Sequence, residues 1–196
     1  MIRFFDILIS VIVLIIFSPV LTVLALFIIL EDGLPILYCQ YRTGQNGHPF
    51  VMYKLRSMRN RKTEGLNITV GGHDPRILKV GWFIRKYKFD EIPQLFNVLK
   101  GQMSIVGPRP EVKHYTDMYD ETQRKVLSVK PGITDYASIE FRNENELLEK
   151  AKNPEHYYIN SIMPEKIRLN QIFANNPSIR NYFDVLFKTL EKIILN

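Results

Sequence analysis

The chain contains a single cysteine, Cys39, among its 196 residues. An intrachain disulfide is therefore impossible, and cysteine-rich zinc sites are excluded. Zinc-ligand spacing is also missing among the four histidines, which are His48, His73, His114 and His156. A chain without disulfides fits a reducing, cytoplasmic setting.

Charge is absent from one long stretch, because no charged residue occurs from Ile7 to Leu30. As an α-helix these residues would reach about 36 Å, enough to cross a hydrocarbon core of roughly 30 Å. A secretory signal peptide fits poorly, since its apolar part would be about half as long. No small-residue cleavage site precedes Glu31 and Asp32 either. The stretch therefore predicts a membrane-inserted helix.

Ser18 and Pro19 lie at the middle of this apolar stretch. Proline cannot donate to the carbonyl of Ile15 and its ring crowds the preceding turn, so we expect a kink. The hydroxyl of Ser18 is placed to satisfy part of the freed carbonyls. A kink at mid-depth permits a re-entrant helix that enters and leaves through one leaflet. Spanning helices also tolerate proline, so these residues alone leave both topologies open.

The net charge of +6 lies outside the apolar stretch, because Arg3 and Asp6 are the only charged residues among the first 30. A basic surface beside a membrane segment indicates anionic lipid headgroups or phosphorylated substrates before nucleic acid. We expect two parts, a membrane-inserted helix at residues 1–32 and a cytoplasmic domain at residues 33–196.

The domain sequence predicts an α+β fold that is mainly helical. Short apolar runs at residues 36–43 and 49–58 flank "TGQNGHP" and predict a β-hairpin. Helices are expected at 111–127 and 144–151 and in the C-terminal segment 180–195, whose apolar residues have helical spacing.

Two further segments lie between the hairpin and the first of these helices. Residues 64–75, "EGLNITVGGHDP", predict a mobile loop. Residues 76–89 mix aromatic and basic residues in "RILKVGWFIRKYKF". That mixture favours an amphipathic helix at the lipid–water interface, or equally a half-buried helix with a basic face.

Two acids, Asp90 and Glu91, stand side by side at the start of a predicted helix. Its helical spacing is carried by Ile92, Leu95, Phe96 and Leu99, and Gly101 is a C-cap. Acids at a helix start interact favourably with the helix dipole, by about 0.3–1 kcal/mol each when exposed. Capping therefore explains the pair without any function. The same electrostatics keep a carboxylate ionised, and an ionised carboxylate is a nucleophile.

Basic residues surround the acid pair in the sequence. Arg109 lies between Pro108 and Pro110, which restrict the backbone and present the guanidinium in a form suited to bidentate phosphate binding. Lys54 and Arg56 alternate along a predicted strand, so they share one face.

The stretch "FDEIPQLFNVLKGQMSIVGPRP", residues 89–110, resembles the signature of the bacterial sugar transferase family, the small monotopic phosphoglycosyl transferases. "YKLRSM", "KPGIT" and the Ser18-Pro19 break also match, in the same order, from residue 1 to about 160. We expect the minimal catalytic form, without the N-terminal region of larger members. After "KPGIT" the chain departs from the pattern. Asp135-Tyr136-Ala137-Ser138 stands where many members have Gly-Trp-Ala-Gln, which leaves the sugar specificity open.

The resemblance implies transfer of a sugar phosphate from a UDP-sugar to a membrane polyprenol phosphate, with release of UMP. This step starts assembly of a surface polysaccharide or a glycoprotein glycan. It implies that Asp90 is the nucleophile, that it forms a covalent aspartyl phosphosugar, and that Mg²⁺ assists. Asp90 and Glu91 are the expected metal ligands, and Glu91 is alternatively a proton carrier. The expected phosphate-binding residues are Arg85, Arg109, Lys54, Arg56 and Arg142.

The resemblance also implies that Ser18 and Pro19 make the helix re-entrant, and that the domain lies on the cytoplasmic face of the bacterial inner membrane. The expected partners are the UDP-sugar, polyprenol phosphate and membrane lipid, without nucleic acid. Homo-oligomerisation is left open. Two alternatives remain. In one, polyprenol phosphate attacks directly while Asp90 only holds Mg²⁺. In the other, the chain is a membrane-anchored basic binding module without catalysis.

Overall fold

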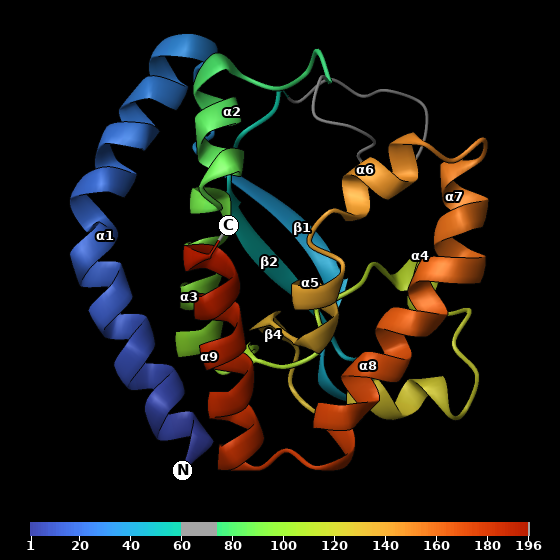
Figure 1. Ribbon diagram of the computed structural model, residues 1–196. Coiled ribbons are helices and arrows are strands. Elements are labelled where there is room, and N and C mark those ends of the chain that lie inside the picture. Colours follow the sequence, from blue (N-terminus) through green and yellow to red (C-terminus); the bar gives the residue numbers. More distant parts are fainter. Residues whose placement is uncertain (60–73, 196) are drawn as a thin grey trace.

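The computed structural model describes residues 1–59 and 74–195 (Figure 1). Its α-helices are α1 (Ile2–Asp32), α2 (Lys79–Lys86), α3 (Gln94–Leu99), α4 (Lys113–Thr116), α5 (Tyr136–Glu140), α6 (Glu144–Glu149), α7 (Pro154–Tyr157), α8 (Met163–Asn175) and α9 (Ile179–Ile194). The strands are β1 (Leu37–Thr43), β2 (Pro49–Leu55), β3 (Ser104–Val106) and β4 (Gly132–Thr134). Shorter helical turns are η1 (Gln45–Gly47), η2 (Phe89–Glu91), η3 (Gln123–Ser128) and η4 (Tyr158–Ile162).

The first helix, α1, continues through Pro19 without a break. Figure 1 shows it bowed, with both ends nearer to the rest of the molecule than its middle. The hydroxyl of Ser18 donates to the carbonyl of Ile15 at 2.9 Å, and this is the carbonyl that Pro19 leaves free. The compensating role that the sequence predicts for Ser18 is confirmed.

α1 is long and apolar enough to cross a membrane, judged by its length and composition. Many of its large apolar side chains are exposed, among them Phe4, Ile15, Ile16, Val23, Leu26, Phe27 and Leu30. A continuous exposed apolar surface of this kind marks a partner that is itself apolar. The helix therefore indicates membrane association.

The N-terminal end of α1 is fixed to the domain by polar contacts. Arg3 donates to the carbonyl of Leu99 at 2.9 Å. Asp6 is 2% exposed, and its Oδ1 accepts hydrogen bonds from the hydroxyls of Ser104 and Tyr182 at 2.9 and 3.0 Å. It also accepts the backbone N–H of the residue after Ser104, at 2.9 Å. This buried carboxylate therefore joins α1, β3 and α9.

The C-terminal end of α1 is fixed to the same domain. The carboxylate of Glu31 accepts the backbone N–H groups of Lys79 at 2.7 Å and Val80 at 3.1 Å, which are free donors at the start of α2. Asp32 lies 3.5 Å from the guanidinium of Arg56. Both ends of the helix thus contact one body.

Two small sheets lie inside the shell of helices (Figure 1). β1 and β2 form an antiparallel hairpin in which Tyr38 faces Lys54 and Thr43 faces Pro49. β3 and β4 are parallel, with Ser104 beside Gly132. The predicted hairpin and the α+β, mainly helical class are confirmed.

The helix expected at 111–127 is wrong as a single element. The structure has α4 and η3 there, separated by residues 117–122. The side chains of Asp120 and Gln123 accept each other's backbone N–H, at 2.8 and 3.1 Å. This reciprocal cap starts a new helical turn, so it ends any continuous helix.

The other helix predictions fare better. α6 and α9 confirm the helices expected at 144–151 and 180–195. α2 lies within 76–89, with Trp82 and Phe83 exposed while Ile84 is buried. It is therefore half-buried. Residues 64–73 of the predicted mobile loop lie outside the described residues.

Candidate active site

Asp90 lies in the 3₁₀ turn η2, between α2 and α3. Its residue is 9% exposed, and Lys54 Nζ lies 4.0 Å from Oδ2. The other carboxylate oxygen, Oδ1, is buried and has no hydrogen-bond partner within residues 1–59 and 74–195. A buried acceptor without a donor is costly unless a ligand supplies what is missing. Asp90 therefore presents one uncommitted oxygen.

The turn that carries Asp90 is anchored by the preceding residue, Phe89. The ring of Phe89 lies 5.8 Å from that of Phe83 on α2 and 6.0 Å from that of Phe17 on α1. Lys88, which begins the turn, has a φ of 59°, an uncommon left-handed conformation. The membrane-associated helix and the carboxylate are thus linked through one aromatic side chain.

Glu91 is paired with Arg109. The guanidinium approaches the carboxylate at 2.5 and 3.4 Å through two nitrogens, which is the bidentate geometry that arginine forms with carboxylates. Lys54 Nζ lies 3.6 Å from Glu91 as well. Lys54 therefore stands between the two acids and contacts both.

Burial and charge act in opposite directions on these groups. Burial raises the pKa of Asp90, and Lys54 opposes that shift. Burial also favours the neutral form of Glu91, but the charges of Arg109 and Lys54 outweigh it and hold the pKa of Glu91 well below its usual value. Burial lowers the pKa of Lys54, although Glu91 opposes it. The adjacent acids thus have pKa values shifted in opposite directions, so they suit different roles.

The turn that presents Arg109 follows β3 and is held against β4. A Cβ atom on Gly132 would lie 2.1 Å from the backbone nitrogen of Gly107, so only glycine allows this approach. The backbone N–H of Gly107 donates to the carbonyl of Thr134 at 3.0 Å. The N–H of Arg109 itself donates to Oδ2 of Asp135 at 2.6 Å.

The structure brings together only some of the predicted site residues. Lys54 and Arg109 contact the acid pair. Arg85 contacts Met58 Sδ at 3.3 Å, and its charge contributes to lowering the pKa of Asp90 against the larger effect of burial.

Arg56 and Arg142 are engaged elsewhere. Arg56 is 4% exposed, follows the end of β2 and donates to the backbone carbonyl of Asp32 at 3.1 Å. It joins the hairpin to the end of α1. Arg142 donates to the carbonyl of Lys192 at 2.7 Å, near the end of α9.

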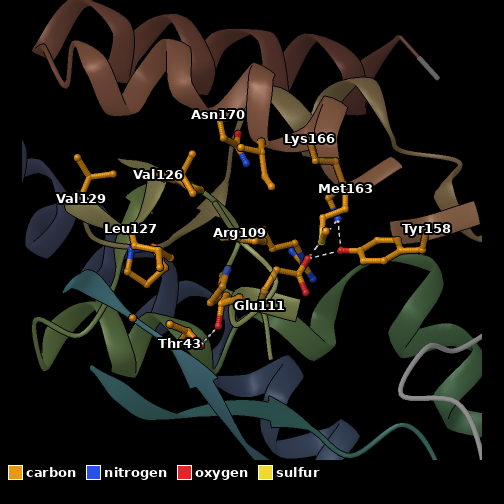
Figure 2. Close-up of a pocket in the computed structure, with 17 residues that line it drawn as sticks. Thr43, Arg109, Glu111, Val126, Leu127, Val129, Tyr158, Met163, Lys166 and Asn170 are labelled. Atoms are coloured by element: carbon orange, nitrogen blue, oxygen red, sulfur yellow. Dashed lines mark hydrogen bonds and ion pairs between the residues drawn. The ribbon is translucent and has the colours of Figure 1, made fainter. Parts of the chain in front are cut away.

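A polar cluster behind Arg109 was not foreseen from the sequence (Figure 2). Glu111 accepts a hydrogen bond from the hydroxyl of Tyr158 at 2.5 Å and lies 3.5 Å from Lys166 Nζ. Lys166 also pairs with Glu144 at 3.0 Å. Arg42 lies 3.7 Å from the other oxygen of Glu111. In the sequence, the one signal that could have pointed to Glu111 is its position two residues after Arg109. Its partners come from distant segments.

The acid pair fits a magnesium ion that is shared with a substrate. No group of three or more candidate ligands occurs within the described residues. Mg²⁺ commonly binds proteins through only one or two carboxylates, with substrate phosphate oxygens completing its shell. Asp90 and Glu91 are two adjacent carboxylates of this kind, and Mg²⁺ binding by them stays a prediction.

The family model of the bacterial sugar transferases matches residues 1–196. The chain belongs to this family. The acid pair, the Pro108–Pro110 turn and the apolar helix are therefore features of a bacterial sugar transferase.

Curated relatives carry names that specify their reactions. A UDP-glucose:undecaprenyl-phosphate glucose-1-phosphate transferase of Klebsiella pneumoniae is 34% identical over 99% of this chain. A UDP-N-acetylgalactosamine-undecaprenyl-phosphate N-acetylgalactosaminephosphotransferase of Aeromonas hydrophila is 34% identical over 98% of it. An undecaprenyl-phosphate galactose phosphotransferase of Salmonella typhimurium is 33% identical over 98%. The alignments cover 40%, 43% and 40% of these relatives. The chain thus spans less than half of their length.

Proposed function

We propose that this chain transfers a sugar phosphate from a UDP-sugar to a membrane polyprenol phosphate and releases UMP. The reactions in the relatives' names support this, although their sugars differ. The observation that carries the proposal is Asp90, whose buried Oδ1 has no partner among the described residues while Lys54 and the Glu91–Arg109 pair flank it. The reaction is the first step in assembling a surface polysaccharide or a glycoprotein glycan.

The proposed chemistry has two substitutions at phosphorus. Oδ1 of Asp90 attacks the phosphate that bears the sugar, a P–O bond forms, and the bond to the departing UMP breaks. The acceptor's phosphate oxygen then attacks the same phosphorus and releases the carboxylate. An ionised acid is needed for the first step. Burial raises the pKa of Asp90 and disfavours that form, and the positive charge of Lys54 opposes the effect of burial.

Cations must offset the charge of the donor diphosphate as it approaches a carboxylate. Arg109, Lys54 and Arg85 are the cations we assign to this task, because two contact the acid pair and the third acts on Asp90. Asp90 and Glu91 would hold Mg²⁺, which supplies further neutralisation of the diphosphate when bound.

The test is UMP release from a panel of UDP-sugars with polyprenol phosphate and Mg²⁺. We expect Asp90→Asn to lower turnover by at least about a thousandfold, because a neutral amide is not an effective nucleophile. Asp117→Asn is the matched control, since Asp117 is exposed and pairs only with Lys113 among described groups. Undiminished turnover by Asp90→Asn would contradict the nucleophilic role. No UMP release by the wild type with any of the UDP-sugars would instead favour the non-catalytic binding module.

A covalent adduct on Asp90 distinguishes the proposed mechanism from direct attack by the acceptor. Protein incubated with donor but without acceptor should gain one sugar phosphate on Asp90, as measured by mass spectrometry of peptides. Product formation with no adduct and with sequential kinetics would favour the alternative in which Asp90 only binds metal.

We further infer that α1 is re-entrant and that the domain lies on the cytoplasmic face of the inner membrane. Arg3 and Asp6 contact the domain at one end of α1, and Glu31 and Asp32 contact it at the other. A helix crossing the bilayer would separate its ends by roughly 30 Å of hydrocarbon, so one end would lose these contacts.

Cysteine labelling tests this topology. In a Cys39→Ser background, a cysteine at position 1 and another at exposed Tyr41 should react with an impermeant reagent from the same side. In intact cells both cysteines should be protected from the reagent until the membrane is permeabilised. Labelling of position 1 alone in intact cells would show a spanning helix.

A further inference from the structure

Asp135 is a buried carboxylate that the proposed chemistry does not use. It is 1% exposed and stands at the start of α5. Oδ1 accepts the backbone N–H of Ser138 at 2.5 Å. Oδ2 accepts the backbone N–H of Arg109 at 2.6 Å and the side-chain amide of Asn170 at 3.0 Å. Three donors therefore converge on one carboxylate from three separate segments.

The N–H of Arg109 is the only backbone donor within residues 108–110, because Pro108 and Pro110 have none. The carbonyls of the two prolines are held separately, by Gly132 N–H at 3.0 Å and by a nitrogen of Arg42 at 3.4 Å. Asp135 therefore accepts the hydrogen bond from the backbone N–H of Arg109, whose side chain faces Glu91.

We propose that Asp135 is a positioning residue for Arg109, fixing the backbone from which the guanidinium reaches the donor diphosphate. This inference rests on the proposed function. It concerns a position at which the chain departs from the common family pattern after "KPGIT". Asp135 does not touch substrate in this proposal and acts only through Arg109.

The space behind Arg109 explains why a fixing contact is needed. A small cavity of about 30 Å³ lies there, lined by Arg109, Lys166 and Asn170 among others (Figure 2). Oδ1 of Asn170 is buried without a partner in the part of the chain that the structure describes, while its amide nitrogen is turned to Asp135. The turn thus has unfilled volume on one side, and the Asp135 carboxylate opposes movement into it.

The chemistry of the three donors requires an acid at position 135. An asparagine has one acceptor oxygen, and its NH₂ group would face at least one of the N–H donors. A serine retains a side-chain oxygen that caps α5 through the Ser138 N–H, but it is too short to accept from Arg109 as well. Asp135→Ser therefore separates helix capping from the hold on Arg109.

The test is a double-mutant cycle with Asp135→Ser, Arg109→Ala and the pair of changes in the full chain. We measure kcat/KM for UMP release, the dissociation constant of UDP with Mg²⁺, and the melting temperature. Asp135→Ser alone should lower kcat/KM about tenfold. In the Arg109→Ala background it should change kcat/KM less than twofold, because no guanidinium remains to be positioned. The dissociation constant of UDP should likewise rise with Asp135→Ser when Arg109 is present and change little in the Arg109→Ala background.

An equal fold-loss in both backgrounds would overturn the proposal, since a general structural effect is independent of Arg109. Wild-type kcat/KM in Asp135→Ser would overturn it as well. If no UDP-sugar gives UMP with the wild type, the proposed function fails. The cycle on UDP affinity then still decides whether Asp135 acts through Arg109.

Discussion

Arg109 faces Glu91 with two of its nitrogens, at 2.5 and 3.4 Å from the two carboxylate oxygens. The guanidinium that we assign to the donor diphosphate is thus already neutralised by the acid beside Asp90, the proposed nucleophile. Glu91 therefore sets where Arg109 points, and Arg109 keeps Glu91 ionised.

Replacement of Glu91 by glutamine should release Arg109 from its partner. We expect turnover to fall by roughly a hundredfold. We also expect the free energy of unfolding to fall by about 1–3 kcal/mol, because a partly buried cation loses its charged acceptor. Steady-state UMP release and urea unfolding measure the two effects. Full activity in Glu91→Gln would show that neither orientation of Arg109 nor metal binding depends on this carboxylate.

Lys54 is the only described base that lies within 4.0 Å of both acids. Replacement by methionine keeps the apolar stem and removes the charge, so we expect kcat/KM for the UDP-sugar to fall about a hundredfold. Lys54→Arg should recover part of that loss, since it restores a cation. Tyr53, the preceding residue, offers a control: Tyr53→Phe removes only the hydroxyl that Lys100 contacts at 2.9 Å. Equal activity in Lys54→Met and wild type would contradict the role assigned to the charge.

The pH dependence of stability should report on Glu111. Burial favours its neutral form, but Lys166, the Tyr158 hydroxyl and Arg42 outweigh burial and hold its pKa below the ordinary 4.5. A carboxyl whose pKa is lowered by folding stabilises the folded state above its unfolded pKa. That contribution is lost as the pH falls through the folded pKa.

Unfolding free energies measured from pH 6 down to pH 3 should therefore decline below about pH 4.5 in the wild type. In Glu111→Gln the decline should be shallower, because the titrating group is gone. Parallel curves for the two proteins would show that Glu111 does not contribute to the acid sensitivity.

Asp6 should be important for stability although it lies within the N-terminal helix. Its Oδ1 accepts three hydrogen bonds. Asp6→Asn keeps an acceptor oxygen but removes the charge that strengthens these bonds, so it should lower the free energy of unfolding by about 1–3 kcal/mol in detergent. Ser10→Ala is the matched control, because the buried Ser10 hydroxyl has no hydrogen-bond partner among the residues described. Thermal melting compares the two. A larger shift for Ser10→Ala than for Asp6→Asn would contradict this account.

Gly132 should not tolerate a side chain. A Cβ there would lie 2.1 Å from the nitrogen of Gly107, so Gly132→Ala must push β4 away from the turn that carries Arg109. We expect overpacking to lower the free energy of unfolding by about 1–3 kcal/mol. If Asp6→Asn lowers stability by the same amount, Gly132→Ala should still lose more activity, because it displaces the turn that carries Arg109. Melting temperatures and UMP release on the same samples distinguish these effects.

Local patterns in the sequence identified the parts of the fold that depend on neighbouring residues. The hairpin, α9 and the Ser18 hydroxyl were predictable, because turn residues, helical spacing and a proline act over a few positions. The helix at 111–127 failed because apolar spacing does not reveal the reciprocal cap at Asp120 and Gln123.

The candidate site was predictable in part. The adjacent acids and the proline-flanked Arg109 could be found by residue type and order. Arg56 has the charge of a phosphate ligand, but its buried contact with the end of α1 depends on long-range packing that no spacing rule supplies. The same applies to Asp135, whose donors come from segments 26 and 35 residues away.

The described contacts couple both ends of α1 to the domain, through Arg3 and Asp6 at one end and Glu31 and Asp32 at the other. If the bilayer thickened or thinned around the inserted helix, the whole molecule would tilt or rise, and Asp90 would move with it through Phe17 and Phe89. The height above the lipid headgroups of Asp90, the proposed nucleophile, is then set by membrane thickness. Turnover in vesicles of graded acyl-chain length would vary with that height while the soluble donor bound equally well in each.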